Sequence, residues 1–355
     1  MYPKIVIHLN SIIENMKYIK ALCKRNNITL SLVTKLLSDN KEIVSALIQN
    51  GADCICDSRI ENLISYKDLN VEKWLIRLPA FSEIPYIIKY ADASFNSELC
   101  TIEALNKEAA KQGKKHKIIL MYELGDLREG CLKYELKLIL RKCFELKNIE
   151  VYGIGVNLSC YGEIMPSKDN MNDLASTVIE LENEFHVKFK VISGGNSSSY
   201  HMMKNSELPS IINNLRMGEA VFFGRVPCIE EDIAELNHHN FILKAQIIEL
   251  KEKPSKPWGI SGMSNSFGEH VNFEDKGIRK RAIINLGRQD IKIDAIKPVD
   301  DEIQIIYGSS DHIILDVTDC KKFYKVGDIV DFNMNYSGVL SAMTSKYIKK
   351  EIEKI

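Results

Sequence analysis

The sequence predicts an α/β protein built as a (β/α)8 TIM-type barrel followed by a C-terminal mostly-β domain. Eight short apolar segments of strand length alternate with amphipathic helical segments before residue 225. Units of this kind form a parallel sheet with both faces covered, and eight of them close a barrel. Beyond residue 240, helical periodicity gives way to β-rich runs joined by Gly, Pro and Asp turns. We therefore expect a barrel over residues 1–232 and a β-rich domain over residues 233–355.

The composition is that of an ordinary globular protein, with 45% hydrophobic and 27% charged residues among 355. Forty-seven Lys and Arg against 48 Asp and Glu give no net field that would favour nucleic acid or an anionic membrane. No apolar run has the length of a membrane span, and the first residues turn polar too early for a secretory signal. The nine cysteines include no CxxC pair, so we expect reduced thiols, a cytoplasmic protein and no metal site.

The first elements follow from local patterns. Residues 5–9 form an apolar strand pattern, and Asn10-Ser11 can cap a helix over 12–24. The spacing then predicts the eight barrel strands at 31–35, 54–57, 74–78, 93–96, 118–123, 152–157, 190–193 and 212–216. Amphipathic helices such as 41–50, 101–112 and 173–185 separate them. The polar run between residues 230 and 240 predicts a linker, and β strands are expected at 241–250, 281–285, 304–307, 312–317 and 329–334.

The loops after the last two barrel strands are rich in hydrogen-bond donors. The first reads Ser193-Gly194-Gly195-Asn196 and continues into three serines, and the second places Arg216 two residues before Gly218. Glycines allow a ligand to approach the backbone, and loops in these two positions hold phosphate in many (β/α)8 barrels. Two ordinary turns between strand and helix would have the same composition, so this alternative stays open.

Four further side chains fall at strand ends. Lys35 ends the first strand, Arg128 lies just past the fifth, Asn157 ends the sixth and Arg216 ends the eighth. Because catalytic groups of this fold lie at the carboxyl ends of the strands, these side chains converge on one rim. A phosphorylated aldehyde held as an imine would use all of them. The simpler interpretations are a solvated boundary lysine and, around Arg128, a salt-bridged surface turn.

The chain resembles the fold-type III, pyridoxal-phosphate-dependent alanine racemase family, and most closely its ornithine racemase branch. Val33-Thr34-Lys35 matches the segment with the Schiff-base lysine, and Arg128 matches the arginine that contacts the cofactor phenolate. Arg216 matches the arginine paired with the pyridine nitrogen. The runs Gly-Asp-Leu-Arg-Glu-Gly, Gly-Gly-Asn-Ser-Ser and Asn-Asn-Leu-Arg-Met-Gly-Glu-Ala are those associated with ornithine.

The resemblance also implies the rest of the cofactor site. Ser197, within Asn196-Ser197, matches a phosphate ligand, as do the backbone amides of Gly218 and Glu219. The expected cofactor-binding set is Lys35, Asn157, Asn196, Ser197, Arg216, Gly218 and Glu219, and the expected catalytic set is Lys35, Arg128 and Asp311. In the β-rich domain, Asp311 and Asp316 keep the spacing of the family's MDxxxxD segment.

The sequence departs from the family pattern at several positions. Asp39 stands where alanine racemases carry a phosphate-binding tyrosine, and Asn157 replaces the histidine that packs on the cofactor ring. Phe267 occupies the expected place of the partner chain's tyrosine, which acts as the second base. Tyr336 and Tyr347 are candidates for the C-terminal tyrosine that reaches the phosphate.

The resemblance implies an isomerase that removes the α-proton of an amino acid held as an imine and returns a proton on the opposite face. Lys35 serves one face, while the candidates for the other are Cys160, Tyr161, His270 and Asp311. Ornithine is the expected substrate, with Asp311 or Glu163 facing its side-chain ammonium in a head-to-tail homodimer. The alternatives are racemisation of alanine or lysine, broad specificity, a non-catalytic pyridoxal-phosphate carrier of the same barrel type, and a decarboxylase or metal-dependent D-amino-acid lyase of this fold type.

Overall fold

The computed structural model describes residues 1–227 and 229–354, and the chain divides into two compact units. One unit spans Leu9–Asn240, and the other combines Met1–His8 with the chain from Phe241 onward. The barrel unit ends at Asn240, eight residues beyond the expected boundary at residue 232. The first eight residues, expected in the barrel, belong to the second unit. Each unit is described separately below.

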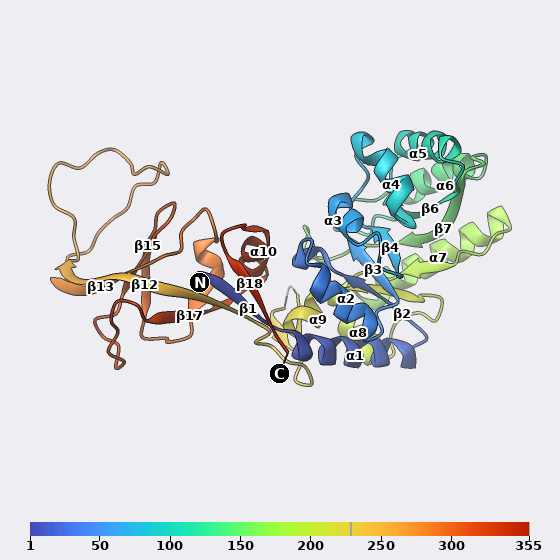
Figure 1. Ribbon diagram of the computed structural model, residues 1–355. Helices are drawn as coiled ribbons and strands as arrows, with labels where there is room; N and C mark the ends of the chain where they lie inside the picture. The colour runs from blue at the N-terminus through green and yellow to red at the C-terminus, as the bar shows by residue number, and fades with distance from the viewer. Residues whose placement is uncertain (228, 355) are drawn as a thin grey trace. The chain divides into compact units, whose positions relative to one another are not determined.

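The first unit is a closed barrel of eight strands, in which all neighbouring strands are parallel (Figure 1). This confirms the predicted barrel. The strands in order are β2 (Thr29–Val33), β3 (Cys54–Asp57), β4 (Glu72–Leu75), β5 (Ala93–Asn96), β6 (His116–Met121), β7 (Ile149–Gly155), β8 (Val191–Ser193) and β9 (Asn214–Met217).

Helices join successive strands and carry their apolar residues toward the barrel. They are α1 (Leu9–Arg25), α2 (Lys41–Gln49), α3 (Ile60–Ser65), α4 (Ile84–Tyr90), α5 (Leu99–Lys111), α6 (Lys133–Cys143), α7 (Lys168–Phe185), α8 (Tyr200–Lys204) and α9 (Glu219–Phe223), with short 3₁₀ turns η1 (Lys35–Leu37), η2 (Phe81–Glu83) and η3 (Ser197–Ser199). Helix α7 begins five residues before the expected start because the Ser167 hydroxyl accepts the Asn170 amide at 3.3 Å and caps it.

An apolar layer inside the barrel forms the floor on which the site is built. Trp74 and Phe95 pack with ring centroids 6.1 Å apart. The Arg216 guanidinium lies over the Phe95 ring, 4.7 Å from its centroid. Gly155 leaves room for this stacking, since a Cβ there would lie 3.3 Å from Phe95 and 3.5 Å from Arg216 Nη1. The guanidinium of Arg216 is therefore stacked on the apolar interior of the barrel.

The expected linker between residues 230 and 240 is instead bound to the barrel unit. Residues Arg225–Val226 (β10) and Glu231–Asp232 (β11) pair as a short antiparallel ribbon. The amide of Asn237 donates to Asn15 Oδ1 at 2.8 Å, and Asn240 Nδ2 donates to the Phe222 carbonyl at 2.9 Å. Because this segment is hydrogen-bonded to the Asn15 side chain and the Phe222 carbonyl of the barrel, it does not serve as a solvated connection.

The second unit is mostly antiparallel β structure. Its elements are β1 (Lys4–His8), β12 (Phe241–Pro254), β13 (Ile278–Ile284), η4 (Ile293–Ala295), β14 (Ile296–Pro298), β15 (Gln304–Gly308), β16 (Ile313–Asp316), β17 (Ile329–Met334), α10 (Tyr336–Thr344) and β18 (Lys349–Glu353). Strand β1 pairs antiparallel with β12 and parallel with β18, which explains why residues 1–8 belong here. Among the described residues, no helix is both long and apolar enough to cross a membrane.

Candidate functional site

Lys35 is the first residue of η1, directly past the end of β2, and its side chain is half-buried. The preceding residue ties this turn to the neighbouring strand. The Thr34 amide donates to the Cys56 carbonyl at 2.8 Å, and its hydroxyl donates to Asp57 Oδ2 at 3.2 Å. The backbone at Lys35 is therefore held from two sides, and the lysine lies at the carboxyl rim of the barrel, where the sequence predicts it.

Asp57 is a fully buried carboxyl group behind this turn. Burial raises its pKa to about 6, and the amide of Arg59 and the side chains of Asn62 and Thr34 partly oppose that shift by donating hydrogen bonds. A buried carboxyl group that accepts so many donors fixes the local backbone. We assign it the task of holding the turn that carries Lys35.

Arg216 lies within β9 and is 4% exposed. Its Nη2 donates to the Val156 carbonyl at 2.7 Å, and its Nη1 donates to the Ser193 hydroxyl. In the strand register it stands beside Ser31 of β2, which brings it to the side of the barrel that carries Lys35. Burial lowers the pKa of the guanidinium. The group is thus a rigid donor in the barrel mouth.

The two loops predicted to form a phosphate cup do meet. The Ser197 hydroxyl accepts the amide of Gly218 at 3.3 Å and the amide of Ala220 at 3.1 Å. A Cβ at Gly218 would lie 3.1 Å from Val33, so the cup also abuts the end of β2. Burial raises the pKa of the Glu219 carboxyl, while the charges of Arg225 and Lys35 oppose the shift. The lysine and the cup therefore share one electrostatic environment.

The three polar residues beyond β7 and β8 form a connected group. Asn196 Nδ2 lies 3.2 Å from Asn157 Oδ1 and 2.8 Å from the Leu158 carbonyl, and it also lies 3.5 Å from Cys160 Sγ. The buried Nδ2 of Asn157 and the buried hydroxyl of Ser198 have no hydrogen-bond partner in the protein. Buried polar groups left in this state are partners for a bound molecule.

Arg128 lies on the β6–α6 loop and is half-exposed, with its guanidinium paired to Glu129. The hydrogen bond to Glu129 raises the pKa of the guanidinium, and the nearby Cys160 adds to the effect. Asp126 makes a different set of contacts: its buried carboxylate accepts the backbone amides of Cys160, Tyr161 and Gly162 at 3.1–3.4 Å. This carboxylate joins the β6–α6 and β7–α7 loops.

The remaining predicted residues lie in the β-rich unit. Asp311, in the turn between β15 and β16, is exposed, and its pKa is lowered by hydrogen bonds from Ser310 and His312. Phe267 is 43% exposed under the Arg288 guanidinium. Tyr336 begins α10 and Tyr347 is exposed. These positions are contained in a different unit from the cup, so their roles in the site stay predictions.

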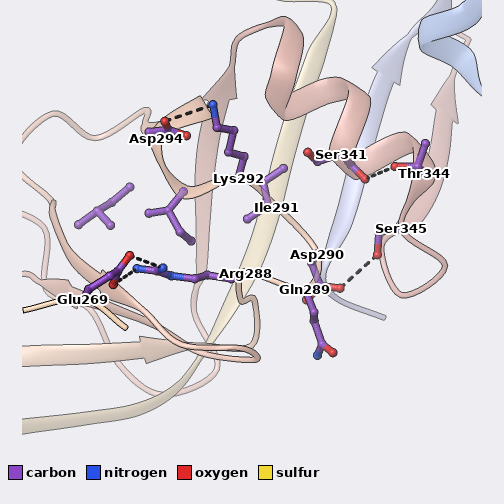
Figure 2. A pocket seen from close by; sticks show the side chains of 12 residues that line it. Glu269, Arg288, Gln289, Asp290, Ile291, Lys292, Asp294, Ser341, Thr344 and Ser345 are labelled. Atoms are coloured by element: carbon purple, nitrogen blue, oxygen red, sulfur yellow. Dashed lines mark hydrogen bonds and ion pairs between the residues drawn. The ribbon is translucent and has the colours of Figure 1, made fainter. Parts of the chain in front are cut away.

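A pocket of about 940 Å³ lies within the β-rich unit, and Figure 2 shows the side chains that line it. Arg288 pairs with Glu269, Lys292 pairs with Asp294, and Asp290 accepts the Ser345 hydroxyl at 3.1 Å. Because Arg288 and Lys292 are already paired with carboxylates, the pocket offers an anionic ligand less than the barrel mouth does.

Comparison with known proteins decides the family. The family model described as "Alanine racemase, N-terminal domain" matches residues 7–226. The chain belongs to the alanine racemase family. It is 47% identical over 353 residues to the ornithine racemase of Acetoanaerobium sticklandii, a match that covers 99% of this chain and 100% of that protein. It is 36% identical over 355 residues to the lysine racemase of Thermotoga maritima, with 99% of each chain covered.

Solved structures share the fold of this family member at much lower identity. The alanine racemase of a D-cycloserine-producing Streptomyces lavendulae superposes with a TM-score of 0.78 at 15% identity, over 100% of this chain and 98% of that one. The Bartonella henselae alanine racemase with covalently bound pyridoxal phosphate superposes with a TM-score of 0.75 at 19% identity, over 99% of this chain and 100% of that one. A D-threonine aldolase from Filomicrobium marinum superposes with a TM-score of 0.74 at 13% identity, over 97% of this chain and 88% of that one. The fold thus hosts more than one reaction.

As a member of this family, the chain is a pyridoxal-phosphate-dependent isomerase. The barrel mouth fits that cofactor. A lysine lies beside a cup of backbone amides and hydroxyls, and a buried guanidinium lies on the barrel floor. The unpartnered donors of Asn157 and Ser198 supply further contacts. Anion-binding groups next to a lysine amine are what a phosphorylated aldehyde requires.

Sequence reasoning missed several contributors to this racemase-family site. The loop around Arg128 was interpreted as a possible salt-bridged surface turn, yet the Asp126 carboxylate in it accepts backbone amides 34–36 residues further along the chain. Ser193 and Val156 were not singled out, although they hold Arg216. Their positions at the ends of β8 and β7 were the available signal, because side chains at neighbouring strand ends meet at the rim.

Proposed function

We propose that this protein interconverts the L and D enantiomers of ornithine. The observation that carries the proposal is the graded similarity to racemases of known substrate. Identity is 47% over the full length to an ornithine racemase, 36% to a lysine racemase, and 25% over only 158 residues to the alanine racemase of Treponema denticola. Lysine is the second candidate substrate, since its side chain also ends in an ammonium group.

Lys35 is proposed to bind the cofactor and to move the α-proton on one face of the substrate. When bound, pyridoxal phosphate withdraws electrons from the substrate's α-carbon and makes that proton acidic. The held turn at Thr34 and Asp57 fixes the backbone that carries Lys35 at the rim. A fixed amine at this position can take a proton from one side of the α-carbon and return it to the same side.

Arg216 and the cup are proposed to hold the cofactor. The amides of Gly218 and Glu219, with the Ser197 hydroxyl and Asn196, would bind its phosphate, and Arg216 would donate to its ring nitrogen. Arginine keeps its proton in proteins, so a nitrogen that accepts from it stays unprotonated. The consequence is a weaker electron sink, which favours simple proton exchange over transamination.

We also propose a head-to-tail homodimer in which the β-rich unit of one chain closes the barrel of the other. The β12–β13 loop exposes Trp258, Ile260 and Met263 almost completely, and apolar side chains gathered in this way mark interaction surfaces. A closed site needs an acid for the ornithine ammonium, because an unpaired buried charge is costly. Asp311 is the proposed acid, and the exposed Glu163 is the alternative.

Complementation tests the dimer. Once Asp311→Ala alone is shown to be inactive, mixing its chain with a Lys35→Ala chain should partly restore activity, because one hybrid site keeps both residues. Verified heterodimers without activity would place both residues in the site of a single chain.

The proposed compartment is the cytoplasm. The eight cysteines that the structure describes are all free thiols, six of them at least partly buried. A reducing compartment keeps thiols in that form.

Two measurements test the proposed activity. Purified protein with pyridoxal phosphate is incubated with L-ornithine, L-lysine or L-alanine, and the enantiomers are separated by chiral chromatography. We expect D-ornithine to form with the highest kcat/KM. Borohydride reduction and peptide mapping should place the cofactor label on Lys35, and Lys41→Arg serves as the control variant. Preference for another amino acid would refute the ornithine assignment, and a label elsewhere would refute the role of Lys35.

A further inference from the structure

Racemisation by two groups requires a second proton-transfer group that faces Lys35 across the substrate. The barrel order shows where such a group would lie. Lys35 follows β2, and β7 is three strands away from β2 in the closed ring, next to β6, the strand directly opposite. The loop after β7 carries Asn157 and Cys160. This loop is therefore the place to look within the barrel unit.

Cys160 is a group on that loop with a proton to give. Its Sγ lies 3.5 Å from Nδ2 of Asn196, a residue of the cup, so the thiol borders the cofactor site. Its neighbour in this contact chain, Asn157, has a buried amide nitrogen with no partner in the protein. An unsatisfied buried donor beside the thiol is an independent sign that a bound molecule occupies this space.

Two guanidinium groups, those of Arg128 and Arg216, lie close enough to Cys160 to interact with its thiol electrostatically. Asp126 holds the backbone at Cys160 through the amide at 3.2 Å, and this fixes the loop without reaching the sulfur. The backbone of Cys160 is thus held in place beside the cup.

The alternative groups have weaker claims. Tyr161 is 71% exposed, and the described contact of this residue is its backbone amide to Asp126. His270 and Asp311 belong to the β-rich unit, and both are exposed, as Cys160 also is, so position rather than burial separates these candidates. Cys160 is the candidate whose side chain contacts a residue of the cup.

We propose that Cys160 is the acid–base group on the face opposite Lys35, an inference that rests on the proposed racemase function. In one direction Lys35 accepts the α-proton and the electron pair of the C–H bond stays with the substrate. The S–H of Cys160 then gives its proton to the α-carbon on the other face, leaving a thiolate. In the reverse direction the thiolate takes the α-proton and the Lys35 ammonium returns one. Exchange with water resets both groups.

The test compares Cys160→Ala and Cys160→Ser with Cys100→Ala, which removes an exposed thiol from α5. Ornithine enantiomers are incubated separately in D2O, and inversion and deuterium incorporation at the α-carbon are both measured. We expect inversion to fall at least about 100-fold in both Cys160 variants, the scale of a lost general acid or base. One enantiomer should still exchange its α-proton without inverting, because Lys35 remains. Cys100→Ala should match the wild type.

Chemical labelling of Cys160 provides a second measurement that does not depend on turnover. Alkylation of Cys160 by iodoacetamide, followed by peptide mass spectrometry, should be slowed when pyridoxal phosphate and ornithine are added, while Cys100 should react at an unchanged rate. Inversion within threefold of wild type in either Cys160 variant would overturn the proposal. So would loss of exchange for both enantiomers in a variant that still carries the cofactor on Lys35. Absence of inversion in the wild-type protein would instead refute the proposed function itself.

Discussion

Replacing Asp126 by asparagine should loosen the loop that carries Cys160. The buried carboxylate accepts three consecutive amides, those of Cys160, Tyr161 and Gly162, at 3.1–3.4 Å. Each hydrogen bond to a charged group contributes about 1.5–3 kcal/mol. Asparagine keeps one acceptor oxygen and turns an NH2 group toward the amides, so at least one bond is lost and the others lose their charge assistance. We expect a local cost of about 3 kcal/mol.

Hydrogen–deuterium exchange measures this cost directly. Because about 1.4 kcal/mol corresponds to a factor of ten, amides 160–162 should exchange about 100-fold faster in Asp126→Asn. Asp169→Asn, which removes an exposed carboxylate from the first turn of α7, should leave these amides unchanged. Inversion of ornithine should slow as well, since the loop no longer holds Cys160 in place. Equal exchange of amides 160–162 in Asp126→Asn and wild type would refute the assignment of this carboxylate as their acceptor.

Three further predictions concern the barrel. Ser197→Ala should weaken pyridoxal phosphate binding about tenfold to 100-fold, the scale of a lost hydrogen bond to a charged group. Ser199→Ala should leave binding unchanged, because the Ser199 hydroxyl donates to the Gly194 carbonyl. Titration of the cofactor absorbance measures both affinities. Asp57, with its pKa raised by burial to about 6, contributes most to the stability of the folded state below pH 3.8. His116, with its pKa lowered by burial to about 4, contributes most above pH 6.5. The free energy of unfolding in urea is measured between pH 4 and 6. Relative to wild type, it should therefore rise with pH in Asp57→Asn and fall with pH in His116→Gln, by up to about 1.4 kcal/mol per pH unit. A slope equal to that of the wild type in both variants would contradict both pKa shifts.

The sequence located the rim groups well because their positions follow from strand ends. The segments at 54–57 and 93–96 coincide with β3 and β5. Lys35, expected as the last residue of a strand, instead begins η1 two residues past β2, and Arg128 lies on the loop after β6. In a parallel barrel all carboxyl ends lie on one rim, so a correct strand list already groups these side chains. The donor-rich loops after β8 and β9 meet through Ser197 for the same reason.

The boundary between the units could not be found this way. The polar run at 230–240 has the composition of a linker, but the Asn237 amide donates to the Asn15 side chain and the Asn240 side chain donates to the Phe222 carbonyl, both within the barrel unit. The first strand resembles any barrel strand in its apolar pattern. Its partners are β12 and β18, and Lys4 stands opposite Lys349 in the sheet. No local pattern encodes a pairing across that distance.

The sequence by itself determined the barrel, the lysine at its first strand end, the donor-rich loops and the family they indicate. These features depend on periodicity and on residue types close together in the chain. Only the tertiary structure decided which remote groups satisfy one another: Asp126 with the amides of the next loop, Arg216 with Ser193 and Val156, and Asn196 with Asn157 and Cys160. A buried polar group takes whichever partner the packing brings within about 3 Å, and that choice is made in space rather than along the chain.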